Sequence, residues 1–91
     1  MSVTVRIPTP MRSLTGGAAE VTVEAGPLSD VIAALESQHP GAGERVIDET
    51  GALRRFVNVY VGDEDVRFLD GLTTPVPEGA TVSIIPAVAG G

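Results

Sequence analysis

Apolar and polar side chains alternate strictly in two segments near the start of the chain. Residues 2–7 and 20–24 each carry an aliphatic residue at every second position. This period places the apolar side chains on one face of an extended chain, as in a half-buried β-strand. Prolines and glycines separate the two segments, so we predict an antiparallel hairpin whose loop is longer than a tight turn. The inward positions are Val3, Val5, Ile7, Val21 and Val23.

The apolar period changes from two to about 3.6 residues after Gly26. From Leu28 onward, apolar residues recur at the i, i+3, i+4 and i+7 positions, which form one stripe on an amphipathic helix. Pro27 is suited to the first helical position, and the pair Pro40-Gly41 predicts the end of the helix. The polar residues 41–53 are predicted to form a loop with one short turn near residues 44–47.

Residues 56–61 give the clearest strand signal in the chain. Three valines at alternating positions are expected to face the helix, and Phe56, Asn58 and Tyr60 to face the other way. After a turn, we predict a short strand over residues 66–68. A proline-rich corner at residues 75–79 then leads to a last strand, residues 81–85, whose Val82 and Ile84 point inward.

This order of elements predicts an α+β fold, a ubiquitin-like β-grasp roll. Its mixed sheet would have about four to five strands, with one main helix packed across it. Residues 1–86 form the predicted domain, and residues 87–91 a flexible C-terminal tail ending in Gly-Gly. Pro86 has no backbone N–H, so the sheet is expected to end there. Five extended residues reach roughly 16–18 Å.

Composition excludes several kinds of chemistry. The 91 residues include no cysteine, which removes disulfides, thiolate zinc sites and cysteine nucleophiles. Twelve acidic residues against six arginines give a net charge of −6, the wrong sign for binding nucleic acid. The sole histidine, His39, lies at the predicted helix end and fits a cap or a solvated group better than a catalytic or metal site. No segment has the length of a membrane span or the pattern of a signal peptide, so we expect a soluble, cytoplasmic protein.

Several stretches resemble a known family, the ubiquitin-like sulfur carriers of the MoaD/ThiS kind. The resemblance covers the whole chain, and its C-terminal third is the most specific part. Within the family, the chain looks most like the CysO branch, the carriers for cysteine biosynthesis. The matching stretches are Phe56 to Val61 followed by Gly62 to Asp65, Leu72 with the Pro77-Glu78-Gly79 corner, and Val82 to Pro86 running into Val88-Ala89-Gly90-Gly91.

The resemblance implies a carrier protein and not an enzyme, with no cofactor or metal of its own. The Gly91 carboxylate would be adenylated and converted to a thiocarboxylate, and the small residues Gly90, Ala89 and Val88 would let the chain end enter a narrow active site. The implied partners are an ATP-Mg-dependent adenylyl/sulfurtransferase of the ubiquitin-activating type, a PLP-dependent cysteine synthase and a zinc peptidase that releases cysteine. No residue in the chain is assigned a catalytic role.

Phe56, Tyr60, Ile85 and Pro86 are candidate residues for docking a partner. The first three lie on strand positions that face away from the helix, where an apolar patch rimmed by charge marks a partner site. The alternative is that the long loop covers them. Asp63 to Asp65 is predicted to be a solvated turn, or else a contact for a basic groove. Other functions remain open: a carrier for molybdopterin or thiamine biosynthesis, a non-covalent binding module, or a modifier joined to lysines through Gly91.

Overall fold

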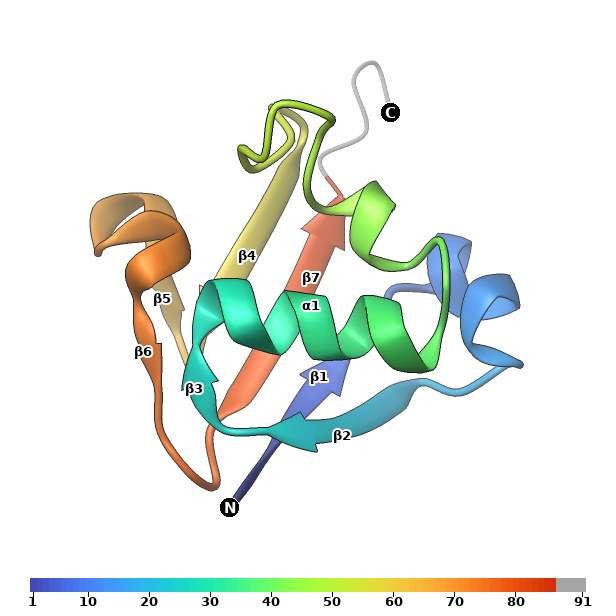
Figure 1. Ribbon diagram of the computed structural model, residues 1–91, viewed down its shortest axis with the longest axis horizontal. Coiled ribbons are helices and arrows are strands. Elements are labelled where there is room, and N and C mark those ends of the chain that lie inside the picture. The colour runs from blue at the N-terminus through green and yellow to red at the C-terminus, as the bar shows by residue number, and fades with distance from the viewer. Residues whose placement is uncertain (87–91) are drawn as a thin grey trace.

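The computed structural model describes residues 1–86, and in these residues one α-helix lies across a mixed sheet of five strands (Figure 1). The strand order is β2-β1-β7-β4-β5, with β1 and β7 parallel and the other neighbours antiparallel. The α+β, β-grasp prediction is confirmed. The elements of the sheet are β1 (Ser2–Arg6), β2 (Glu20–Glu24), β4 (Val57–Val61), β5 (Glu64–Asp65) and β7 (Thr81–Pro86).

The hairpin of β1 and β2 forms as predicted, but the connection between the two strands contains a helix that was not predicted. Val3 lies opposite Val23 in the register of the two strands. The connection contains a 3-10 helix, η1 (Thr9–Thr15), that begins after Pro8. The Thr15 hydroxyl donates to the backbone oxygen of Ala18 at 2.9 Å, which ties the end of η1 to the following turn. The sequence did not predict this helix, because Pro8 and Pro10 indicated only the end of the preceding strand.

The main helix, α1 (Leu28–Gln38), buries the predicted stripe. Pro27 precedes the helix and belongs to the two-residue strand β3 (Gly26–Pro27), which pairs with β6 (Pro75–Val76). The backbone N–H of Leu28 donates to the oxygen of Thr74, the residue just before β6, at 2.9 Å, and this bond satisfies an N–H of the first helical turn. The buried residues of α1 are Leu28, Val31, Ile32 and Leu35.

The long connection after α1 is held by its own hydrogen bonds. It contains the 3-10 helix η2 (Gly43–Arg45) at the predicted short turn, followed by a β-bridge between Ile47 and Leu53. Oδ1 of Asp48 accepts hydrogen bonds from the Thr50 hydroxyl at 2.6 Å and from the Thr50 and Ala52 backbone N–H groups. The Thr50 hydroxyl and these N–H groups lower the pKa of Asp48 by stabilising its charged form.

The prediction of a strand over residues 66–68 was wrong. The strand in this region is the shorter β5, whose Glu64 and Asp65 pair with Val61 and Tyr60, so these two residues are not part of a turn. A 3-10 helix, η3 (Val66–Phe68), follows directly and leads to another, η4 (Gly71–Thr73). Oδ1 of Asp65 accepts the backbone N–H of Arg67 at 2.9 Å, and this cap favours a helical turn over continued strand pairing.

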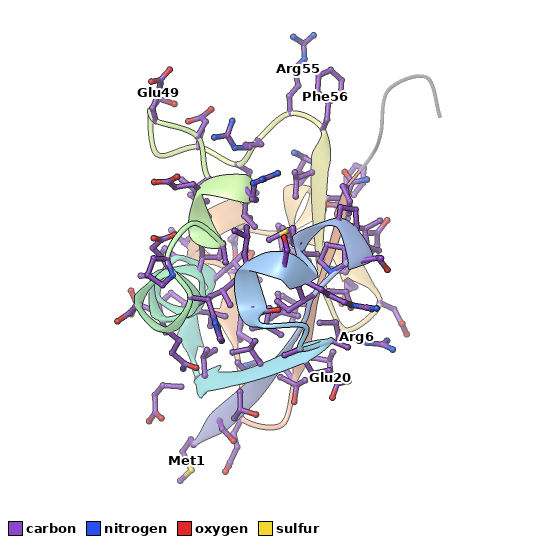
Figure 2. All side chains as sticks on the ribbon, turned by 90° about the vertical axis from the view of Figure 1, so that its right-hand side faces the viewer. Met1, Arg6, Glu20, Glu49, Arg55 and Phe56 are labelled. Atoms are coloured by element: carbon purple, nitrogen blue, oxygen red, sulfur yellow. The ribbon has the colours of Figure 1, made fainter. Side chains whose placement is uncertain are left out.

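The core fills the space between α1 and the inner face of the sheet. Seen along the helix in Figure 2, α1 forms one layer and the sheet the other. The predicted inward positions are confirmed, since Val59 and Val82 are each 1% exposed and Val61 packs against the core from a half-buried position. Among residues 1–86, no helix is both long and apolar enough to cross a membrane.

Candidate functional site

The last strand, β7, carries the chain toward the predicted site from the middle of the sheet. It lies between β1 and β4, and its final residue, Pro86, pairs with Val57. The predicted acceptor Gly91 and the clearance residues Gly90, Ala89 and Val88 lie outside the described residues, as does the whole predicted tail. The structure therefore describes the chain up to Pro86, the residue from which the predicted tail continues. We call Pro86 the tail root, and the structure also describes the surfaces around it.

Of the predicted docking residues, Tyr60 lies on β4, and Ile85 and Pro86 lie on β7. The prediction that Phe56 belongs to the strand was wrong, because β4 begins at Val57 and Phe56 lies in the turn before it. Phe56 is 56% exposed and Ile85 is 46% exposed, whereas Tyr60 and Pro86 are half-buried. Ile85 pairs with Asn58 of β4. Within the described part of the chain, the long loop does not cover Phe56 or Ile85. Their role in docking stays a prediction.

Arginines surround this apolar patch. The Arg55 guanidinium lies 5.6 Å from the centre of the Phe56 ring, within cation–π range, and both side chains point away from the domain (Figure 2). Arg67 donates from Nη1 to Oδ1 of Asn58 at 2.7 Å and from Nη2 to the backbone oxygen of Arg54 at 2.6 Å. A patch with apolar centres and cationic edges therefore lies beside the tail root, although the whole chain is acidic.

A hollow of about 320 Å³ opens on the other side of the tail root. Its lining includes Arg45, Arg54 and apolar residues from three parts of the chain. Arg54 is held there because its Nε donates to the backbone oxygen of Glu44. Nothing in the sequence indicated that Arg45 would lie near Pro86. The apolar lining residues are Pro10, Met11, Val57, Ile84 and Pro86.

The other titratable residues give no sign of a catalytic centre. His39 is the C-cap of α1, and its backbone N–H donates to the oxygen of Leu35 at 2.8 Å, in agreement with the cap interpretation. Among residues 1–86, no three histidine, cysteine, aspartate or glutamate side chains are grouped so that they could hold a metal ion. Asp48, whose pKa is lowered, is occupied by the bonds of its own loop.

Comparison with known proteins agrees with the resemblance drawn from the sequence. The sulfur carrier protein CysO of Mycobacterium tuberculosis is 50% identical over 93 residues, covering 100% of both chains. CysO in the crystal structure of the Amycolatopsis orientalis BexX/CysO complex is 48% identical, with a TM-score of 0.92 over 98% of this chain and 99% of that one. The crystal structure of Mycobacterium tuberculosis CysO is 49% identical, with a TM-score of 0.89 over 94% of this chain and 99% of that one. The first of these relatives is named a sulfur carrier protein, which is a carrier and not an enzyme. Residues 5–91 match the ThiS family, and the chain belongs to that family.

Proposed function

We propose that this protein is a sulfur carrier whose C-terminal Gly91 is adenylated and then converted to a thiocarboxylate. The observation that carries the proposal is a Gly-Gly terminus five residues beyond the last strand, in a chain 50% identical over its full length to CysO carriers. The globular domain supplies recognition, and the chain end supplies the reacting group. The catalytic groups, ATP-Mg and any other cofactor belong to partner enzymes.

The two steps make specific demands on the last residue. A carboxylate oxygen of Gly91 attacks the α-phosphorus of ATP, and pyrophosphate leaves. Hydrosulfide then attacks the carbonyl carbon of the acyl adenylate and AMP leaves, which gives the thiocarboxylate directly. A persulfide donor would instead form an acyl disulfide, and a second thiol of the donor would cleave it by forming a disulfide with the donor sulfur. Both attacks occur next to the terminal Cα, where a side chain would hinder approach. Glycine at both final positions leaves this approach open.

The patch of Phe56 and Ile85, flanked by Arg55 and Arg67, is the proposed docking surface for the activating enzyme. Exposed apolar side chains with charged edges are typical of partner sites, and this patch lies next to the root of the tail. The Amycolatopsis orientalis relative was crystallised in a complex with BexX, which supports docking by this kind of domain.

The favoured destination of the sulfur is cysteine, as the CysO relatives suggest. The thiocarboxylate sulfur would attack the β-carbon of an aminoacrylate on a PLP-dependent cysteine synthase. An S-to-N acyl shift then leaves cysteine amide-linked to Gly91, and a zinc peptidase hydrolyses that amide. A carrier for molybdopterin or thiamine biosynthesis would instead give up its sulfur and leave no cysteine attached.

Intact-mass spectrometry of protein purified from its native cells tests the chemistry. The expected species carry a terminal O-to-S exchange or one added cysteine, assigned to Gly91 by fragmenting the C-terminal peptide. A chain lacking Gly91 should show neither product, whereas a chain with one alanine inserted after Met1 should be modified normally. A Gly91-deleted chain that still gains sulfur or cysteine would refute the proposal.

Docking is tested separately by charge reversal on the sheet. Ile85→Asp and Phe56→Asp should weaken binding to the activating enzyme, because each puts a carboxylate on the apolar patch. Thr22→Asp is the matched control, since Thr22 is exposed on β2 at the far edge of the same sheet. Loss of binding in the control, or a collapse of the melting temperature in Ile85→Asp, would contradict the assignment of this face.

A further inference from the structure

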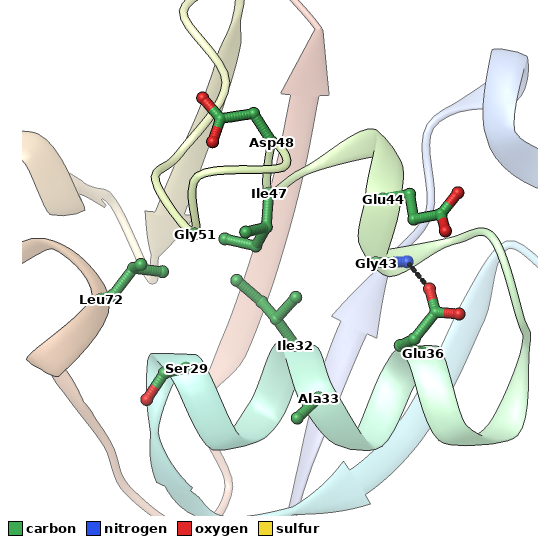
Figure 3. A pocket seen from close by; sticks show the side chains of 10 residues that line it. All are labelled: Ser29, Ile32, Ala33, Glu36, Gly43, Glu44, Ile47, Asp48, Gly51 and Leu72. Atoms are coloured by element: carbon green, nitrogen blue, oxygen red, sulfur yellow. Dashed lines mark hydrogen bonds between the residues drawn. The ribbon is translucent and has the colours of Figure 1, made fainter.

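A second surface feature lies on the helix side of the molecule. The exposed side of α1 and the loop that follows η2 enclose a hollow of about 390 Å³ (Figure 3). We call it the helix-side hollow. Its apolar surface comes from Ile32 and Ala33 of α1, Ile47 of the loop and Leu72 of η4. It shares no lining residue with the hollow beside Pro86.

The walls of the helix-side hollow are fixed by several contacts. The Glu36 carboxylate accepts hydrogen bonds from the backbone N–H of Gly41, at 2.9 and 3.1 Å, and from that of Gly43, at 2.9 Å. These bonds hold the loop against the helix. The bridge between Ile47 and Leu53 and the bonds to Asp48 hold the other end of the loop. The hollow is therefore preformed, a common property of binding sites.

The charged residues that line the helix-side hollow are all acidic. They are Glu36, Glu44 and Asp48, and none of the arginines lines it. Like-charge repulsion disfavours phosphates, nucleic acid, an anionic membrane surface and the terminal carboxylate of the chain itself. An apolar side chain next to a lysine or arginine would satisfy both the aliphatic surface and the carboxylates.

We propose that the helix-side hollow binds a short basic and apolar segment of a partner protein. One leucine- or methionine-sized side chain enters between Ile32, Ile47 and Leu72, and a neighbouring cation lies against the exposed carboxylate of Glu44. The hollow lies on the helix layer, whereas Ile85 is exposed on β7 and Phe56 projects beyond the end of β4, away from the domain (Figure 2). One protein could therefore hold the carrier at the hollow while another engages the sheet face.

The test is an amide chemical-shift titration of the full chain with short acetylated peptides. The binding probe has a leucine pair flanked by lysines; one control peptide replaces the leucines with serines and another replaces the lysines with glutamates. The binding probe should shift the amides of Ile32, Ala33, Ile47 and Leu72 in a saturable way, and the control peptides should not. Raising the salt to 1 M, where the screening length falls to about 3 Å, should weaken binding.

Two variants with matched controls sharpen the test. Ala33→Gln should abolish binding because it fills the hollow from an exposed helix position, while Ser37→Gln, on the same helix outside the hollow, should bind normally. Glu44→Gln should weaken binding about two- to fivefold, as for one exposed ion pair, and Glu49→Gln should not. Equal binding by Ala33→Gln, shifts confined to the sheet face, or no saturable shifts would overturn the proposal. Amide shifts at the hollow that grow with protein concentration in the absence of peptide would mean that a second copy of the chain occupies the hollow, since Arg55 and Phe56 are also basic and apolar. That result would overturn the proposal as well.

Discussion

Replacing Glu36 with alanine should destabilise the fold, although simple helix rules predict the opposite. Glu36 lies in the last turn of α1, where an acidic side chain opposes the helix dipole, and alanine has the higher helix propensity. The structure gives Glu36 a different role. Its carboxylate accepts the backbone N–H of Gly41 at 2.9 and 3.1 Å and that of Gly43 at 2.9 Å. These bonds fix the start of the long connection.

The size of the effect follows from the burial of these groups. Gly43 is buried, so losing its acceptor leaves an unsatisfied N–H at a cost of about 1–3 kcal/mol. Gly41 is half-buried and can recover part of its bonding from water. Relief from the dipole and the better propensity offset roughly 0.5–1 kcal/mol. The expected net loss of unfolding free energy is about 1–2 kcal/mol, or about 4–16 °C in the melting temperature of a domain this small.

Urea unfolding followed by circular dichroism measures this change, with Ser37→Ala and Glu44→Ala as controls on either side of the contact. Glu36→Gln should fall between the wild type and Glu36→Ala, since its amide retains one acceptor oxygen. Gly43→Ala should also destabilise, because an added Cβ would lie 2.8 Å from the Cβ of Glu36. If Glu36→Ala is neutral or stabilising, the hydrogen bonds contribute less than the dipole and propensity terms and the reasoning fails.

Three further predictions concern single side chains. The Thr50 hydroxyl lowers the pKa of Asp48, so the carboxylate stabilises the fold above the ordinary carboxyl pKa of about 4, and this stabilisation is lost as the pH falls through the lower folded-state value. Asp48→Asn should therefore destabilise at pH 7 and lose its effect in acid; an equal effect at both pH values in thermal melts would contradict this. Leu35→Ala should cost about 2–5 kcal/mol in chemical unfolding because Leu35 is fully buried, and a cost no larger than that of Leu69→Ala would contradict the core assignment. Phe68→Ser should change stability by less than about 0.5 kcal/mol, since Phe68 is 88% exposed, and a larger loss would mean that the ring packs on the domain.

The parts of the fold that sequence reasoning predicted correctly are those where a long apolar period meets one buried face. The stripe that begins at Leu28 and the alternating valines of β4 each repeat over several residues, so one chance apolar position could not mislead the assignment. Residues 66–68 offered only two apolar positions and no repeat. There the capping bond from Arg67 N–H to Asp65, which depends on local geometry, determined the structure.

In the candidate site too, some residues could be placed from the sequence pattern and others could not. Alternation along β7 was enough to place Ile85 on the outer side of the sheet, because side-chain direction in a strand follows from position. Phe56 is exposed for another reason, since it lies in the turn before β4. The arginines near the tail root could not be grouped from the sequence. Arg45 comes from η2 and Arg67 from η3, and tertiary packing of these separate turns brings them to the same end of the sheet as Arg54.

A carrier must keep one fold while its terminal group passes through several chemical forms, and the distribution of buried residues is suited to this. Every fully buried apolar side chain in the described residues lies between Val3 and Ile84, on the strands, on α1 or in the connections packed against them. Chemistry at Gly91 therefore need not disturb this core. Under the proposed function, the exposed patch at Phe56 and Ile85 would recognise each partner through the same surface, whichever group Gly91 carries. Selection among the forms would then depend on the active site that receives the chain end, because none of the reacting group lies on the Phe56 and Ile85 patch.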